Sequence, residues 1–202
     1  VMWYGKIPAM GDFVRRRMPD SILLPWERWF SSGVSQIRPF TKPAGVNLAG
    51  SAVPVWGFVR SLPQGGVQGG AVMPSQDRVG REYLVCALVA LDLEQCQRVR
   101  LPVLASLVEQ LGLVLQQGVR FCWAATQVDQ TLCRALSVAG LLADSAAARL
   151  EQRGAGQDIL DVLYGTRGGA VPQDPWVVLQ PCLEPGSQRS YWWCLGMNNP
   201  NW

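Results

Sequence analysis

The chain has 202 residues, which is enough to bury one sizeable core, and it predicts a single domain over residues 1–202. A hydrophobic fraction of 49% with 16% charged residues excludes an intrinsically disordered protein. The net charge of +3 is too small to indicate nucleic-acid binding, and the apolar stretches are shorter than the roughly 20 residues of a membrane span. With no signal peptide visible at the N-terminus, we expect a cytoplasmic protein without membrane insertion.

The first 40 residues predict a strand and then a helix. Residues 2–7 are expected to form a short strand that Pro8 and Gly11 end. The basic run 15–17 is interpreted as a solvated turn after this strand, with an anion site as the alternative. A helix is predicted over residues 25–37, with its proline in the first turn. Its apolar residues repeat at spacings of three and four along one face, so its two tryptophans are expected in the core: Trp26, Trp29, Phe30, Gly33, Ile37.

The middle of the chain predicts a β-hairpin followed by a central strand. Residues 53–60 and 71–73 are expected to pair as antiparallel strands, with glycine pairs at 65–66 and 69–70 marking the turn between them. Residues 83–91 form a continuous apolar run of strand length. That pattern indicates a strand buried on both faces.

The second half predicts three helices and a last hairpin. The first helix begins at Pro102 and carries a wide apolar stripe to Gly118, which is placed to cap its end. Further helices are expected over residues 128–143 and 157–164, and a final hairpin over 175–181 and 190–195. Trp192 and Trp193 must point to opposite faces of that last strand, so at least one of them is expected in the core.

The order of these elements favours an α+β domain. Strands are grouped as one hairpin early and another late, with helices between the two groups. This order indicates a mostly antiparallel sheet covered by helices. A doubly wound parallel sheet would instead need strands and helices that alternate singly.

The residue inventory argues against an enzyme, a metal site or a bound cofactor. The chain has no histidine, so it lacks an imidazole base and half the ligands of the usual zinc frameworks. Its six cysteines contain no C-x-x-C pair, and we interpret them as reduced core residues, among them Cys86 and Cys122. Asp158 and Asp161 are three apart in one predicted helix, where a solvated first turn is the simpler interpretation. The glycines at 65–70 lack the lysine and hydroxyl of a phosphate-binding loop.

The segment 77–82 is the best functional candidate. Arg78 and Arg81 flank Gly80, which can adopt a positive φ angle, so two guanidinium groups can project from one sharp turn. Such a turn suits binding of a carboxylate or phosphate on a partner. Alternatively, these arginines pair internally with Asp12, Asp77 or Glu82 and fasten the first loop to the middle one. The segment 11–13 has the same two interpretations: Asp12 caps a turn while Phe13 packs inward, or both lie in an exposed mixed-charge patch.

Three segments together resemble one family. They are Gly-Lys-Ile-Pro-Ala-Met-Gly-Asp-Phe-Val at 5–14, Met-Pro-Ser-Gln-Asp-Arg-Val-Gly-Arg at 73–81, and Tyr-Trp-Trp at 191–193. In this order they resemble the TagF (ImpM) family of type VI secretion-associated proteins, and the segments 24–29 and 54–58 also fit. The resemblance implies a compact three-layer domain similar to longin-like folds. It also implies post-translational repression of the secretion apparatus through a forkhead-associated (Fha) scaffold protein.

Two functions remain open at this point. The first is a non-enzymatic regulatory protein that binds a partner through the following residues: Asp12, Phe13, Asp77, Arg78, Gly80, Arg81 and Trp193. The second is a small-molecule or phosphate sensor whose pocket is formed by the two arginines and the glycine-rich hairpin. A hydrolase that uses Asp and Ser is poorly supported. The position of Arg78 and Arg81, in a pocket or on an open surface, distinguishes the first two.

Overall fold

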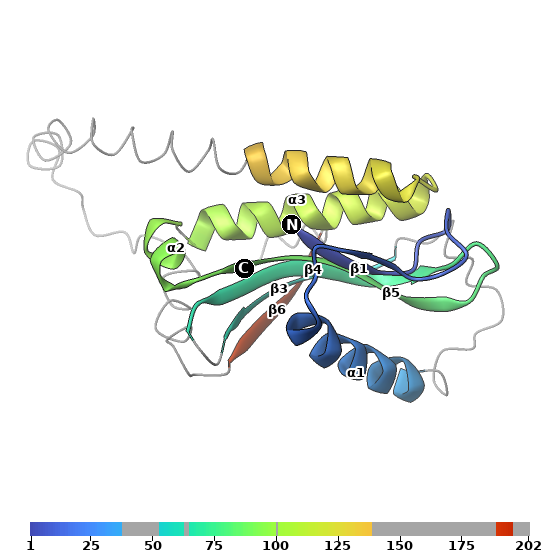
Figure 1. Ribbon diagram of the computed structural model, residues 1–202, viewed down its shortest axis with the longest axis horizontal. Helices are drawn as coiled ribbons and strands as arrows, with labels where there is room; N and C mark the ends of the chain where they lie inside the picture. The colour runs from blue at the N-terminus through green and yellow to red at the C-terminus, as the bar shows by residue number, and fades with distance from the viewer. Residues whose placement is uncertain (38–52, 63–64, 100, 139–188, 196–202) are drawn as a thin grey trace, which may run out of the picture.

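The computed structural model describes residues 1–37, 53–62, 65–99, 101–138 and 189–195. These residues form a six-stranded sheet with helices on both faces (Figure 1). The strands are ordered β2-β1-β5-β4-β3-β6, and each neighbouring pair is antiparallel. The predicted α+β class with an antiparallel sheet and layered helices is confirmed.

The bounds of the strands follow the apolar runs of the sequence. They are β1 Met2–Gly5, β2 Val14–Arg16, β3 Val55–Ser61, β4 Val67–Gln76, β5 Glu82–Leu91 and β6 Ser190–Leu195. The predicted hairpin of β3 with β4 and the predicted central strand β5 are confirmed. The glycines at 65 and 66 form the turn with φ angles of 90° and 92°, whereas those at 69 and 70 lie inside β4.

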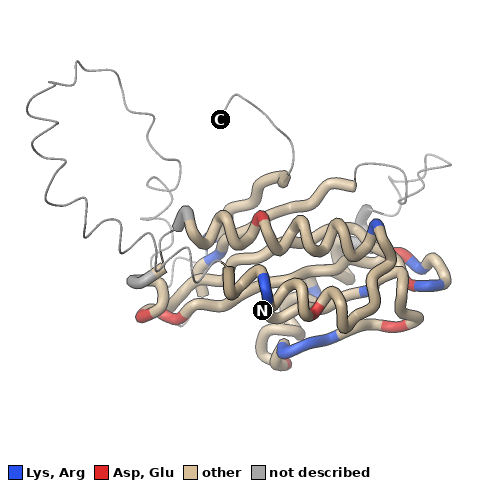
Figure 2. The backbone as a smooth tube through the Cα atoms, turned by 90° about the horizontal axis from the view of Figure 1, so that it is seen from above, with Lys and Arg blue, Asp and Glu red and all other residues tan. Residues whose placement is uncertain are grey.

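Helices cover the two faces of the sheet. Helix α1, Asp20–Ile37, packs on one face, where Trp26 and Phe30 join Phe58 and Leu88 in a core. The other face carries α2, Leu93–Arg98, α3, Leu101–Arg120, and a helix through residues 125–138. Figure 2 shows α3 and the helix through 125–138 side by side on this face. No helix in the described part of the chain is long and apolar enough to cross a bilayer.

Three predictions about the first 40 residues are wrong. Helix α1 begins at Asp20, not at residue 25, so Pro25 lies inside the helix, on its exposed side. An exposed position can accommodate the missing N–H because water satisfies the freed carbonyl. The basic run is also no simple turn, since β2 includes Arg15 and Arg16 and pairs with β1. Trp29 is exposed, whereas Trp26 is buried as predicted.

Helix α3 ends differently from the prediction. Gly118 lies within the helix, where an added Cβ would be 3.0 Å from Val128. The end is a Schellman motif in which the Trp123 N–H bonds to the Gly118 carbonyl. Cys122, with φ of 51°, occupies the left-handed position and is exposed, so the prediction that it lies in the core is wrong. Cys86 is buried as predicted.

Helix α2 was not predicted, although Asp92 and Gln95 form a capping box at its start. Strand β6 is confirmed and pairs with β3, and its two tryptophans do point to opposite faces. The helix predicted over 128–143 is present through residue 138. The predicted loop at 41–51, the helix at 157–164, the strand at 175–181 and Cys182 lie outside the described residues. The single domain over 1–202 and the longin-like label stay predictions.

We predict that Gly70→Ala destabilises the fold by about 1–3 kcal/mol, because overpacking at a close contact forces shifts in its neighbours. An added Cβ there would lie 2.4 Å from the Ala87 carbonyl oxygen and 2.8 Å from the Phe58 ring. The control is Gly33→Ala in α1, where no atom lies within 4 Å, and it is expected to stabilise by up to about 1 kcal/mol. Urea unfolding measures both, and equal effects of the two variants would contradict the packing at Gly70.

Candidate functional site

The loop from β1 to β2 and the turn from β4 to β5 lie against each other. Residues 6–13 and 77–81 form what we call the two-loop cluster. They meet because β1 and β5 are neighbours in the sheet and both segments leave it at the same end. The Arg78 N–H donates to the Met10 carbonyl at 2.8 Å, and Arg81 Nη2 donates to the Gly11 carbonyl at 2.7 Å.

The carboxylate of Asp77 holds the cluster together. It is almost fully buried, with 1% of the residue exposed. Its Oδ2 accepts from Lys6 Nζ at 3.0 Å and from Arg81 Nε at 2.6 Å. Its Oδ1 accepts from the backbone N–H groups of Val79 at 3.1 Å and Arg81 at 2.9 Å. One carboxylate therefore fixes the shape of its own turn and binds it to the first loop.

The hydrogen bonds to Asp77 keep its carboxyl group ionised. Burial alone would raise the pKa of this carboxyl, because it penalises the ionised form. The bonds from the Arg81 N–H, the Lys6 ammonium, the Arg81 guanidinium and the Val79 N–H outweigh burial. They hold the pKa of Asp77 well below its ordinary value, so the group is ionised at neutral pH. Lys6 was not among the predicted site residues, although it lies within the Gly-Lys segment that resembles the family.

Gly80 has the positive φ that the sequence predicted, with a value of 82°. Two hydrogen bonds close the turn: the Gly80 N–H donates to the Asp77 carbonyl, and the Asp77 N–H donates to the Arg81 carbonyl. No atom lies within 4 Å of an added Cβ at Gly80, so its left-handed backbone, rather than crowding, favours glycine there. Arg81 is thereby directed back to Asp77.

The two arginines have different environments. Arg81 donates hydrogen bonds through Nε to the Asp77 carboxylate and through Nη2 to the Gly11 carbonyl of the first loop. This is the internal pairing that the sequence left open as one of two alternatives. Arg78 is exposed, and its side chain has no hydrogen bond or ion pair with another described residue. Its Nη2 lies 3.5 Å from the Cβ position of Gly11. Arg78 is thus held over the first loop with its charge uncompensated.

The two loops that carry Arg78 also carry exposed apolar side chains. Val79 is 69% exposed, Phe13 43% and Met10 39%. The Phe13 ring stacks on Tyr4 at 5.5 Å and meets the edge of Tyr83 at 4.8 Å. It is therefore fixed in orientation while its outer part remains in solvent. Rigid, partly exposed apolar groups beside an arginine are typical of protein contact surfaces.

Asp12 and Trp193 contribute in other ways. The Asp12 carboxylate is exposed and accepts the N–H of the next residue, Phe13, at 2.8 Å. Trp193 lies on β6 opposite Gly57, against the core on the α3 side, and is not brought to the two-loop cluster. An added Cβ at Gly57 would be 2.6 Å from the Trp193 ring. The more exposed tryptophan of the pair is Trp192.

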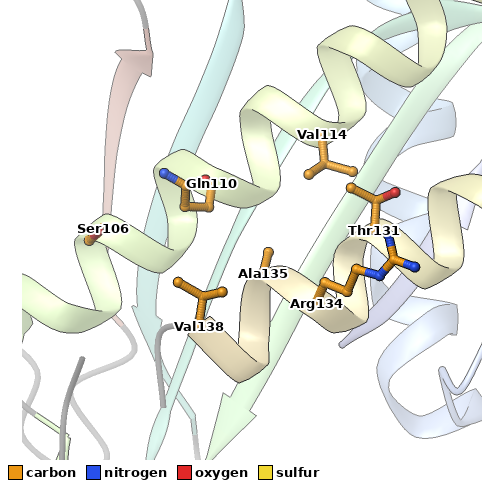
Figure 3. Close-up of a pocket in the computed structure, with 7 residues that line it drawn as sticks. All are labelled: Ser106, Gln110, Val114, Thr131, Arg134, Ala135 and Val138. Carbon is orange, nitrogen blue, oxygen red and sulfur yellow. The ribbon is translucent and has the colours of Figure 1, made fainter. Parts of the chain in front are cut away.

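The structure separates the parts of the proposed sensor pocket. The glycine turn at 65–66 precedes β4 and the two arginines follow it, so they lie at opposite ends of a ten-residue strand. A cavity of about 290 Å³ lies elsewhere, between α3 and the helix through 125–138 (Figure 3). Its lining is largely apolar, with Arg134 and Gln110 at its sides. Among the described residues, no three or more Asp, Glu or Cys side chains are grouped as metal ligands.

We predict that Asp77→Asn lowers the melting temperature at pH 6 and that this loss shrinks as the pH falls below about 4. The folded-state pKa of Asp77 is depressed, so its ionised form stabilises the protein above the unfolded-state pKa of about 3.9. Below that pH the unfolded chain takes up the proton, and the advantage of the carboxylate over the amide declines. Thermal unfolding of both proteins between pH 6 and pH 3 measures this.

The control for this variant is Asp12→Asn, because Asp12 is exposed and accepts only one local N–H. It is expected to change the melting temperature little at either pH. A loss at Asp77→Asn that stays constant from pH 6 to pH 3 would contradict the ionised, buried carboxylate.

Comparisons with known proteins place the chain in a family. Residues 2–135 match the family model described as the TagF N-terminal domain, type VI secretion system-associated. The two-loop cluster lies inside this range, and the Tyr-Trp-Trp segment at 191–193 lies beyond it. No curated protein matches the chain.

A solved structure is similar in fold. It is the crystal structure of PA0076 from Pseudomonas aeruginosa PAO1 at 2.05 Å resolution, with a TM-score of 0.54 and 26% sequence identity. The match covers 66% of this chain and 61% of that chain, so it spans about three fifths of the solved protein. The chain belongs to the TagF family of type VI secretion system-associated proteins.

Proposed function

We propose that this chain is a non-enzymatic regulatory protein of a type VI secretion system, and that it represses the apparatus in the cytoplasm by binding a forkhead-associated scaffold protein. The partner is the one that the family resemblance implies. The proposed contact surface is the exposed side of the two-loop cluster. Masking of the scaffold by this surface would keep assembly from being licensed.

The observation that carries this proposal is the pairing pattern within the cluster. Lys6 and Arg81 share the charge of Asp77, whereas Arg78 has no counter-charge among the described residues. The cluster therefore presents one exposed cation on a backbone that is fixed to the first loop, with the exposed apolar side chains of Val79 and Phe13 on the same two loops. An arginine desolvated by apolar neighbours and paired with a partner carboxylate or phosphate is a common anchor of protein interfaces.

Contact with a macromolecule is favoured over a small ligand by the shape of this surface. Val79 and the arginine project from the tip of a turn, whereas small-ligand sites are concave and enclosed. The sensor alternative also required the glycine-rich hairpin, which lies at the far end of β4. We therefore favour the protein partner.

We predict that Arg78→Glu weakens capture of the purified scaffold protein by on the order of tenfold or more, because charge reversal replaces attraction by repulsion. The fold is expected to be unchanged, since the Arg78 side chain makes no hydrogen bond within the described structure. Titration of the scaffold onto the full chain, together with circular dichroism, measures both. Val79→Ser is expected to weaken capture less, by loss of apolar contact.

The matched control is Arg134→Glu, which makes the same charge change at an exposed arginine on the helix through 125–138. It is expected to leave capture unchanged. Arg81→Glu is not diagnostic, because it also breaks the bond to Asp77. Undiminished capture by well-folded Arg78→Glu would contradict the proposed surface, and failure of the native chain to capture the scaffold would contradict the proposed partner.

A further inference from the structure

A second surface lies on the α1 face of the sheet, where β3 and β6 form its edge (Figure 1). Its members are aromatic residues of α1, β3 and β6 with two polar residues beneath them, and we call them the tryptophan surface: Trp26, Trp29, Phe58, Arg60, Gln68 and Trp192. Within β4, the tryptophan surface includes Gln68, which is near the start of the strand, whereas the two-loop cluster follows the end of that strand. The two surfaces are therefore separate.

The aromatic rings form one connected group that is open to solvent on one side. Trp26 is buried and contacts Trp29 at 5.6 Å and Phe58 at 4.9 Å between ring centroids. Trp192 contacts Trp29 at 5.3 Å and Phe58 at 4.9 Å. Yet Trp29 is 50% exposed and Trp192 is 38% exposed. Large aromatic rings held in place and left open to water are typical of contact surfaces.

Arg60 lies against these rings, and no described residue serves as its counter-ion. Its guanidinium carbon is 5.2 Å from the Trp26 ring, and its Nε donates to Gln68 Oε1 at 2.8 Å. No described carboxylate pairs with it, and its two Nη groups have no acceptor among the described residues. Partial burial lowers the pKa of Arg60, which is the cost of holding a cation against the rings.

Gln68 adds a second unsatisfied donor. Gln68 is fully buried, and its Oε1 accepts hydrogen bonds from Arg60 Nε and from Trp26 Nε1, the latter at 3.3 Å. Both neighbours are donors, so the orientation of the amide is fixed with its oxygen toward them. The amide Nε2 is left without a partner. An unsatisfied buried donor costs about 1–3 kcal/mol, so such a group in a native protein calls for an explanation.

We propose that the tryptophan surface binds an acidic segment of a partner protein, in which an Asp or Glu carboxylate pairs with the Nη groups of Arg60 and an adjacent apolar side chain packs on Trp29 and Trp192. The charge balance of the surface carries this assignment. Among the described residues it offers a cation without a paired carboxylate, and its acceptor, Gln68 Oε1, is already used by Arg60 and Trp26. A carboxylate supplies two acceptor oxygens and the missing charge.

The geometry favours a carboxylate over a phosphate. The Nε of Arg60 is already used by Gln68, which leaves the two Nη groups for a ligand. The two oxygens of a carboxylate can each accept one N–H bond from these two Nη groups, and its single negative charge balances the positive charge of the guanidinium. A phosphate dianion would retain uncompensated charge against the tryptophan rings, which is costly where water is excluded. The proposal does not rest on the scaffold protein, because it concerns a different surface.

The test selects random dodecapeptides displayed on phage against the full chain. The selected peptides are expected to be enriched in Asp or Glu beside aromatic or aliphatic residues. The best of them is then synthesised in three forms: unchanged, with each Asp and Glu replaced by its amide, and with phosphoserine at the acidic positions. We expect the carboxylate form to bind on the order of tenfold more tightly than the amide form.

Variants of the chain assign this binding to the tryptophan surface. Arg60→Met keeps the length of the side chain and is expected to make the carboxylate and amide forms bind equally. Trp29→Ala, at an exposed ring, is expected to weaken binding severalfold without unfolding and serves if Arg60→Met is unstable. Arg78→Glu, in the two-loop cluster, is expected to leave peptide binding unchanged, so the two surfaces are tested separately.

Four outcomes would overturn the proposal. They are no enrichment of acidic residues, equal binding of the carboxylate and amide peptides to the native chain, tighter binding of the phosphoserine form, and unchanged binding after Trp29→Ala. Dimerisation of the chain without peptide, abolished by Arg60→Met or Trp29→Ala, would assign the surface to a second copy instead and would also overturn it.

Discussion

The buried carboxylate of Asp77 is the interaction on which the two-loop cluster depends. A carboxylate removed from water is costly unless it is paired and its lone pairs are satisfied. Here Lys6 and Arg81 supply charge, and two backbone N–H groups supply further donors. The four bonds come from both loops, so separating the loops would leave the buried charge of Asp77 without part of its partners.

This arrangement explains why the two arginines of one turn have different tasks. Arg81 completes the shell of Asp77 and holds the first loop through the Gly11 carbonyl. The backbone of Arg78 makes the same kind of link, to Met10, which leaves its side chain outside. One arginine thus fixes the surface and the other presents charge on it. The rigid placement of Phe13 against Tyr4 and Tyr83 has the same effect on the apolar part of the surface.

Strand β4 holds the two exposed surfaces apart along its length and gives them a common support. Strand β4 carries Gln68 near its start and leads into Asp77 at its end, and it is buried along most of its length. Both proposed contacts therefore rest on the most buried of the described strands, with a positively charged arginine at each end. Arg60 is fixed by its side-chain bond to Gln68 and Arg78 by its backbone bond to Met10, and neither side chain pairs with a carboxylate among the described residues.

The sequence alone determined the class of fold, the β3–β4 hairpin, the central strand β5 and the presence and start of helix α3, because each depends on local periodicity and turn residues. It also indicated that Gly80 can adopt a positive φ and determined that Trp192 and Trp193 point to opposite faces, since both follow from backbone geometry within a few residues. The segments that identify the family were likewise readable along the chain.

Only the tertiary structure decided which polar groups pair. Strand β2, the start of α1 at Asp20 and the exposure of Trp29 depend on contacts with distant residues, which no local pattern reports. The sequence likewise left open which carboxylate, that of Asp12, Asp77 or Glu82, pairs with the two arginines. In the structure Asp77 pairs with Arg81 and Lys6, and not with Arg78. Charge pairing depends on distance and burial in three dimensions, and residues 71 positions apart come within 3.0 Å here because β1 lies beside β5.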